Sequence, residues 1–257
     1  MRFTRAIVRP PSRTFANGLT SADLGKPELA KALQQHATYC AALERCGLKL
    51  TYLAPDDAYP DSTFVEDPAV LTTNAAILTN PGAPTRNGEV RGIASVLPTF
   101  FSRIVRIEAP GTLEGGDICQ ADDHFFIGVS ERTNPEGARQ LGELLAAEGF
   151  TSSVIDIRDS VTVLHLKTGM SYLGDRRVIV MEELAKHPAF ADYEVIAVPP
   201  EESYAANFLR INDHVILADG FPKVAKVIAG FGHDIIPLNM SEFRKMDGSL
   251  SCLSLRF

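Results

Sequence analysis

The chain has 257 residues, of which 45% are hydrophobic and 22% are charged, a composition typical of a globular enzyme. Its 25 basic and 32 acidic residues leave a formal net charge of −7, which argues against nucleic acid or an anionic membrane as a partner. No long apolar run or amino-terminal signal pattern is visible, and Cys40, Cys46, Cys119 and Cys252 lack metal-ligand spacing. The sequence therefore predicts a reduced, cytoplasmic protein.

The amino-terminal part of the chain predicts a strand, a helix and a second strand. Residues 3–8 form a predicted strand, which is stopped by Arg9-Pro10-Pro11. A helix can begin near Lys26-Pro27, because proline is tolerated in a first turn, and its apolar stripe continues to Cys46-Gly47. Residues 48–53 then form the second predicted strand.

From residue 64 onward a unit of similar pattern repeats along the chain. Each unit opens with polar residues, runs into a short apolar strand, turns, and returns in a second apolar strand. Helices are predicted over 135–148 and 222–229, after the return strands of two units. The opening segments are 64–68, 113–117, 164–169, 202–207 and, at the end of the chain, 251–252.

The spacing of these openers predicts the fold. Asp67, Asp117, His165, Asn207 and Cys252 follow one another at intervals of 50, 48, 42 and 45 residues. Such a period implies a solenoid, a propeller or a closed array, and the mixture of strands and helices makes the class α/β. The last unit is half present, and the strand at 3–8 can complete it, which closes a ring and removes an exposed edge. We expect one domain, residues 1–257, with the openers facing a shared centre.

The polar residues at this centre form a plausible reaction site. Cys252 is a candidate nucleophile, and His165 is a candidate acid and base at neutral pH. The carboxylates of Glu114, Asp117 and the Glu66-Asp67 pair suit a cationic ligand, because paired carboxylates bind an amidinium or guanidinium through charge-assisted hydrogen bonds. A bound cation beside the sulfur also lowers the pKa of a thiol.

Each of these residues has a structural alternative. Cys252 followed by alternating leucines can be a buried core cysteine on a strand that presents Leu253 and Leu255 to one face. His165 between two leucines can be a buried histidine on a strand. Glu66-Asp67 before a proline can cap a turn, and 114–117 has too few glycines for a phosphate cradle. The shared spacing favours the functional interpretation.

The sequence strongly resembles the dimethylarginine dimethylaminohydrolases, above all the short bacterial enzymes. These belong to the guanidine-modifying superfamily, whose fold is the five-bladed α/β-propeller called the pentein. The resemblance extends nearly from end to end and leaves no room for the added helical region of the arginine deiminases. Its motifs are NGLTS at 17–21, FVEDP at 64–68, APGTLE at 109–114, RTN at 132–134, LHLKTG at 164–169, ESYAAN at 202–207 and the tail FRKMDGSLSCLSLRF at 243–257.

The resemblance implies catalytic roles for three residues. Cys252 attacks the guanidinium carbon of asymmetric dimethylarginine or monomethylarginine and forms a thiouronium intermediate. His165 protonates the departing amine and then activates the water that releases citrulline. Glu114 orients His165 and, together with Asp67, binds guanidinium nitrogens.

The resemblance also implies how the amino-acid end of the substrate is held. Arg86 and Arg132 match the arginines that bind the substrate carboxylate. Leu19 and Met246 offer backbone carbonyls to the ammonium group, with Asp61 and Glu66 nearby. Met246 replaces a smaller aliphatic residue, which a backbone contact tolerates. No metal or organic cofactor is implied, and a homodimer is expected from the family alone.

Two other classes of function stay open from the sequence. One is a different guanidine-handling enzyme on the same scaffold: an arginine deiminase, a citrulline- or agmatine-type hydrolase, or an amidinotransferase. Arg86 and Arg132 disfavour agmatine, which has no carboxylate. The other is a non-enzymatic pentein, similar to the ribosome-binding translation factor of this fold, which has no need of Cys252, His165 and Glu114 at one phase of the repeat.

Overall fold

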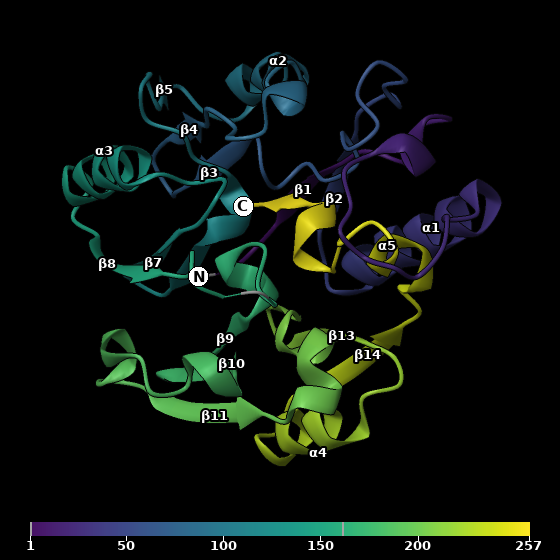
Figure 1. Cartoon of the computed structure of the whole chain (residues 1–257), viewed down its shortest axis with the longest axis vertical. Helices are drawn as coiled ribbons and strands as arrows, with labels where there is room; N and C mark the ends of the chain where they lie inside the picture. The colour runs from purple at the N-terminus through teal and green to yellow at the C-terminus, as the bar shows by residue number, and fades with distance from the viewer. Residues whose placement is uncertain (1, 161) are drawn as a thin grey trace.

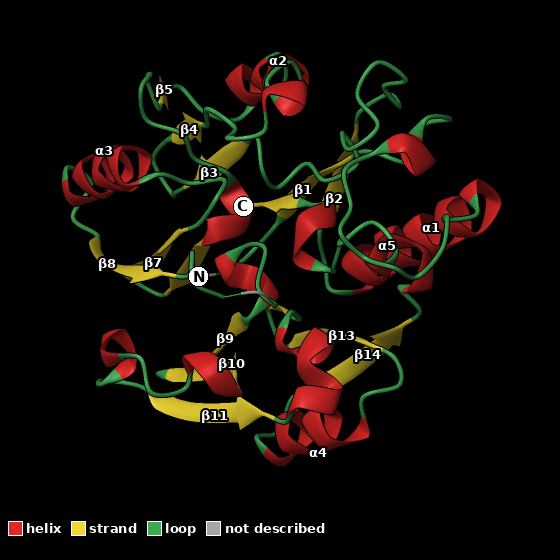
Figure 2. Cartoon of the chain, in the orientation of Figure 1, coloured by secondary structure: helices red, strands yellow, loops and turns green. Residues whose placement is uncertain are grey.

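The computed structural model describes residues 2–160 and 162–257. Five three-stranded sheets surround a common centre (Figures 1 and 2). In every sheet the first strand along the repeat pairs antiparallel with the second, and the second pairs parallel with the third. The sheets consist of β3 (Ala69–Leu71), β4 (Ala76–Leu78) and β5 (Ile104–Arg106); β6 (Ile118–Ala121), β7 (His124–Val129) and β8 (Thr151–Asp156); β9 (Met170–Gly174), β10 (Arg177–Met181) and β11 (Glu194–Val198); β12 (Leu209–Ile211), β13 (His214–Ala218) and β14 (Asp234–Leu238); and β15 (Leu255–Arg256), β1 (Arg5–Val8) and β2 (Lys49–Tyr52).

The parallel pair in each sheet requires a crossover connection, and the helices supply it. They lie on the outside of the ring (Figure 2). Two short 3₁₀ turns, Glu182–Leu184 and Pro188–Phe190, take the place of a helix in the β9–β11 sheet. In the part of the chain that is described, no helix has both the length and the apolar character to cross a membrane. The crossover helices are α1 (Leu29–Arg45), α2 (Glu89–Ala94), α3 (Pro135–Ala146) and α4 (Pro222–Gly230), and α5 (Ser241–Arg244) follows β14.

The two ends of the chain complete one sheet together, as the sequence predicts. β1 pairs antiparallel with β15, with Ala6 opposite Arg256 and Ile7 opposite Leu255. The Phe257 backbone both accepts from the Arg5 amide, at 2.8 Å, and donates to the Arg5 carbonyl, at 3.0 Å. This pairing closes the ring and leaves no half-finished blade, so the predicted five-bladed α/β-propeller is confirmed.

Two sequence-based predictions about the site residues were wrong at the level of local structure. Cys252 lies on a 3₁₀ turn, Ser251–Leu253, so Leu253 precedes the strand instead of belonging to it. His165 caps another 3₁₀ turn, Leu166–Thr168. Polar side chains hold both turns, because the Leu166 amide donates to Asp117 Oδ1 at 3.0 Å and the Ser251 amide donates to Asn207 Oδ1 at 3.0 Å. These side-chain bonds hold the two segments in place of strand pairing. An alternation of apolar and polar residues in the sequence does not reveal such bonds.

Tyr39 ties α1 to the segment that carries Cys252, and this link predicts a stability effect. Its side chain is fully buried, and its hydroxyl donates to the Leu250 carbonyl at 3.0 Å and lies 2.6 Å from Ser254 Oγ. We expect Tyr39→Phe to lower the free energy of unfolding by about 1–3 kcal/mol, because buried polar groups lose their partner. Urea unfolding measures this. The control Tyr52→Phe, at a side chain that is 57% exposed, should change it by less than about 0.5 kcal/mol; an equal effect of both would contradict the assignment.

Candidate active site

The candidate site lies where the turns that precede the inner strands face one another. The turns before β3, β6, β9 and β15 all contribute side chains to one small cavity of about 30 Å³, enough space for about one water molecule. Sequence-predicted residues make up most of its wall, and Phe64, Leu164, Asp247 and Gly248 are additions. The lining residues are Leu19, Asp61, Phe64, Asp67, Arg86, Glu114, Arg132, Leu164, His165, Met246, Asp247, Gly248 and Cys252.

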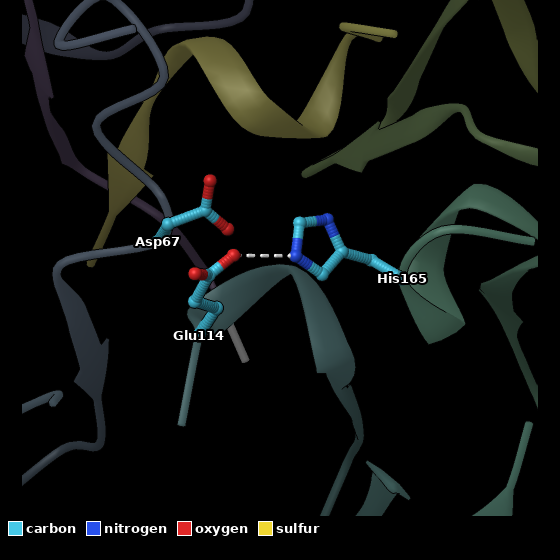
Figure 3. Close-up of side chains that lie close together, drawn as sticks. All are labelled: Asp67, Glu114 and His165. Atoms are coloured by element: carbon cyan, nitrogen blue, oxygen red, sulfur yellow. Dashed lines mark hydrogen bonds and ion pairs between the residues drawn. The ribbon is translucent and has the colours of Figure 1, made fainter. Parts of the chain in front are cut away.

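His165 and Glu114 form a buried hydrogen-bonded pair. His165 Nε2 lies 2.7 Å from Glu114 Oε2, and Figure 3 shows the Asp67 carboxylate beside the same imidazole. Burial alone lowers the pKa of His165, but the charge of Asp67, the Glu114 hydrogen bond and the charge of Asp117 outweigh it and raise the pKa to about 9. The imidazole therefore carries a proton at neutral pH.

Asp67 is held from two sides. Its Oδ1 accepts the Gly116 amide at 2.9 Å, and its Oδ2 accepts Arg86 Nη1 at 2.6 Å. Burial opposes the charge of Asp67, but Arg86 and His165 outweigh burial and lower its pKa. Residue 116 has to be glycine for this approach, because a Cβ there would lie 2.8 Å from the His165 ring and 2.9 Å from Asp67 Oδ1.

Cys252 faces the same cavity as a protonated thiol. Burial, followed by the negative charges of Glu66 and Asp67, raises the pKa of Cys252 to about 11, and Ser249 Oγ lies 3.4 Å from its sulfur. At neutral pH the Cys252 side chain is therefore a thiol and not a thiolate. A cationic ligand in the cavity would supply a positive charge and lower the pKa of the thiol.

Glu66 does not line this cavity, although the sequence predicted it beside Asp67 and the substrate. Its carboxylate accepts Ser251 Oγ at 2.8 Å, Lys167 Nζ at 2.5 Å and Arg256 Nη2 at 3.0 Å. It borders a separate cavity of about 190 Å³ that is lined by residues of all five inner strands. Glu66 thus braces the Cys252 turn from behind, together with Asn207, whose Nδ2 donates to Ser251 Oγ at 2.9 Å.

Asp117 lies behind the site as well. Its carboxylate accepts Ser130 Oγ at 2.7 Å, Thr133 Oγ1 at 2.6 Å and the Leu166 amide. Burial raises the pKa of Asp117, against the lowering effect of these donors and of the His165 charge. Asp117 therefore fixes the turn that carries His165 and does not line the cavity.

The residues predicted for the amino-acid end of a substrate lie at the rim and wall of the cavity. Asp61 accepts the Leu19 amide on both oxygens, at 3.2 and 3.1 Å. Arg132 is partly exposed, and its Nη1 approaches Glu114 Oε1 at 3.8 Å. The Arg86 guanidinium is buried between Asp67 and Glu89, a carboxylate that the sequence interpretation missed. Its only sequence signal is the i, i+3 spacing from Arg86.

Three groups of the site have the donor types of a metal centre. One ligand atom each of Asp67, Glu114 and His165 lies within 4.8 Å of the others. Hydrogen bonds already engage these atoms, since Glu114 Oε2 faces His165 Nε2 and Asp67 Oδ2 faces Arg86. Two guanidinium groups beside the carboxylates make the cavity less favourable for a further cation of high charge density.

The propeller and its site define a guanidine-modifying type of enzyme scaffold: a thiol, an imidazole–carboxylate pair and further carboxylates around one cavity. Comparison with known proteins gives the same class. A model of the arginine deiminase family matches residues 57–202. The N(G),N(G)-dimethylarginine dimethylaminohydrolase of Pseudomonas aeruginosa is 46% identical over 99% of this chain and 100% of its own. The chain belongs to the dimethylarginine dimethylaminohydrolase family.

Solved structures of the family superpose closely. A cysteine-to-serine mutant of the Pseudomonas aeruginosa enzyme, complexed with citrulline, has a TM-score of 0.97 and 46% identity and covers 100% of both chains. A histidine-to-glycine variant of a dimethylarginine dimethylaminohydrolase, solved as an adduct with S-methyl-L-thiocitrulline, has a TM-score of 0.95 and covers 99% of this chain and 100% of its own.

The Glu114–His165 pair predicts a measurable change in titration. We expect Glu114→Gln to lower the pKa of His165 from about 9 by at least about one unit, because the imidazolium loses an anionic acceptor. NMR titration of the ring carbons measures it, and His187, which lies outside the cavity, serves as the internal control. In the native protein the charged His165 contributes stability that is fully present below pH 6.5 and is lost as the pH rises through about 9. An unchanged pKa in the variant would contradict the electrostatic account.

Proposed function

We propose that this protein hydrolyses asymmetric Nω,Nω-dimethyl-L-arginine, and Nω-methyl-L-arginine, to L-citrulline and dimethylamine or methylamine. The observation that carries the proposal is the convergence of Cys252, the Glu114–His165 pair and Asp67 on one buried cavity. The family membership and the citrulline complex of the similar Pseudomonas aeruginosa enzyme support it.

The charge of the cavity suits this substrate. The wall carries four carboxylates against two guanidinium groups and the protonated His165. One negative charge is left over. Dimethylarginine has a guanidinium, an ammonium and one carboxylate, so its single net positive charge offsets that excess. A phosphorylated or purely anionic substrate would meet repulsion instead. The wall carboxylates are Asp61, Asp67, Glu114 and Asp247.

In the proposed first step, Cys252 forms a bond to the guanidinium carbon. The Cys252 thiol gives its proton to solvent as the substrate cation binds and stabilises the thiolate, and the carbon of the guanidinium group is the electrophile. The tetrahedral adduct collapses when the C–N bond to dimethylamine breaks and His165 donates its proton to the departing nitrogen. The pKa of His165 near 9 supports this role, because the acid form dominates at neutral pH.

In the second step, the neutral His165 takes a proton from water, and the hydroxide equivalent attacks the thiouronium carbon. The C–S bond then breaks, the hydroxyl proton of the adduct passes to the departing sulfur, and citrulline and the Cys252 thiol are released. Glu114 orients His165 through both steps. We assign binding of the guanidinium N–H groups to Asp67 and Glu114, each of which has free lone pairs beside its existing bonds.

The amino-acid end has its own proposed partners. Asp61 and the backbone carbonyls of Leu19 and Met246 bind the ammonium group, and Arg132 and Arg86 bind the carboxylate. The burial of Asp61 supports this, because burial raises its pKa and an incoming ammonium would relieve that cost. Glu66 acts from behind the thiol: it braces the turn that carries Cys252, and its negative charge raises the pKa of the Cys252 thiol.

We also propose that residues 1–257 work as one catalytic domain in the cytoplasm. The four cysteines form no disulfide among the described residues, which fits a reducing compartment. The net charge of −7 supports a small-molecule partner in preference to nucleic acid or an anionic membrane. Assembly as a homodimer stays a prediction from the family resemblance.

The chief alternative is an arginine deiminase, and substrate selectivity distinguishes the two. If Asp67 and Glu114 are the carboxylates at the guanidinium end, one terminal nitrogen lacks a charged partner and can carry methyl groups. An unpaired buried N–H costs about 1–3 kcal/mol, so we expect kcat/KM for arginine to be at least about tenfold below that for asymmetric dimethylarginine. Symmetric dimethylarginine should be rejected, because its second methyl group meets the carboxylate side.

The measurement is kcat/KM for arginine, monomethylarginine and both dimethylarginines in one buffer, with citrulline as the detected product. Agmatine serves as the control without a carboxylate and should be a poor substrate. Equal turnover of arginine and asymmetric dimethylarginine would make the protein a deiminase and overturn the proposal.

A further inference from the structure

Glu89 is bound to Arg86 through several hydrogen bonds, although Glu89 itself does not line the cavity. It is the first residue of α2, three residues after Arg86, and only 2% of its surface is exposed. Both oxygens accept Arg86 Nε, at 3.1 and 3.2 Å, and Oε2 also accepts Arg86 Nη2 at 2.8 Å. This side-on geometry fixes both the position and the plane of the guanidinium group.

A count of N–H groups shows what Arg86 has left to offer. A guanidinium group has five N–H donors. Glu89 takes Nε–H and one Nη2–H, and Asp67 takes one Nη1–H at 2.6 Å. The other Nη2–H points to the backbone carbonyls of Asp61 and Phe64, each at 3.4 Å. One Nη1–H is left over, on a nitrogen that lies 3.9 Å from Glu114 Oε2 in the cavity wall.

Arg132 is held less firmly than Arg86, because it is more exposed and has fewer hydrogen bonds. About a fifth of its side chain is exposed, and among the described residues its guanidinium makes no hydrogen bond, only the 3.8 Å approach to Glu114. The cavity of about 30 Å³ has to widen before an amino acid can enter. Arg132 can move at little cost, whereas movement of Arg86 would leave buried Glu89 without its counter-ion.

We propose that Glu89 is a positioning residue for recognition of the substrate α-carboxylate. It holds Arg86 as a fixed guanidinium with one N–H for a carboxylate oxygen, while Arg132 is the movable partner that closes on the other oxygen. This inference rests on the proposed function. It predicts that loss of Glu89 weakens binding of ligands that have an α-carboxylate and leaves the chemical step at Cys252 intact.

The test compares two substrates across three variants. The substrates are asymmetric dimethylarginine and its decarboxylated analogue, dimethylagmatine. The variants are Glu89→Gln, which removes the charge, Glu89→Asp, which keeps it, and Glu202→Gln as the matched control. Glu202 is also a buried glutamate, 5% exposed, but it accepts the Lys223 and Val224 amides at the start of α4, away from the site.

For Glu89→Gln we expect KM for dimethylarginine to rise at least about tenfold, because the substrate carboxylate loses the equivalent of one charge-assisted hydrogen bond. We expect kcat to stay within about threefold of the native value. We expect kcat/KM for dimethylagmatine to change less than about threefold. Glu89→Asp should also raise KM for dimethylarginine, by a smaller factor, and leave kcat unchanged. This second variant keeps the test decisive if Glu89→Gln fails to fold. Citrulline affinity by calorimetry should weaken in parallel, and Glu202→Gln should match the native enzyme in all of these measurements.

The outcomes separate this inference from the proposed function. If the native protein does not hydrolyse dimethylarginine at all, the proposed function fails. If it does, and the Glu89 variants lose activity equally on both substrates, or lose kcat and not KM, Glu89 has only a structural role and the inference is overturned. Native kinetics in both folded Glu89 variants would overturn it as well.

Discussion

The hydrogen bond between Glu114 and His165 is the interaction on which the rest of the site depends. Glu114 is fully buried, and a buried carboxylate without a positive partner is costly. The charge of Asp67 and this bond together keep His165 protonated at neutral pH, and the protonated ring, with Arg86, in turn lowers the pKa of Asp67 and Glu114. The cavity therefore holds Asp67 and Glu114 ionised while the thiol of Cys252 stays protonated, which leaves a site that a cation can activate.

The closed ring is what brings these groups together. Ser251 and Glu66 are hydrogen-bonded although 185 residues separate them, and His165 and Glu114 are 51 residues apart. Four of the five blades supply a turn to the cavity wall, and the pairing of β1 with β15 closes the ring next to the turn that carries Cys252 (Figure 1). A polar layer behind the cavity, with Glu66, Asn207 and Asp117, holds these turns so that the reacting groups keep their geometry.

The sequence predicted the ring because the repeat leaves a regular trace, one polar opener about every 42–50 residues. The prediction that all five openers face one site was right in part: Asp67, His165 and Cys252 line the cavity together with Glu114, whereas Asp117 and Asn207 lie behind it. The sequence did not predict side-chain direction. Glu66 and Asp67 are neighbours, yet Glu66 borders the separate cavity of about 190 Å³ and Asp67 lines the small cavity of the site, because the turn conformation directs the two side chains to opposite sides. Glu89 was missed because its role depends on the position of the Arg86 side chain in the folded protein, and the spacing of residues in the sequence does not give that position.

The most direct test of the account is the identity of the group that bonds to the substrate. His165→Gly protein is incubated with S-methyl-L-thiocitrulline, whose thiol leaves without help from an acid, and is then analysed by intact mass and peptide mass spectrometry. The account predicts a stable adduct of ligand mass minus methanethiol on the tryptic peptide 246–256, whose one cysteine is Cys252, and no adduct when Cys252→Ser is added. An adduct on Cys40, Cys46 or Cys119, or none despite measurable binding of the ligand, would contradict it.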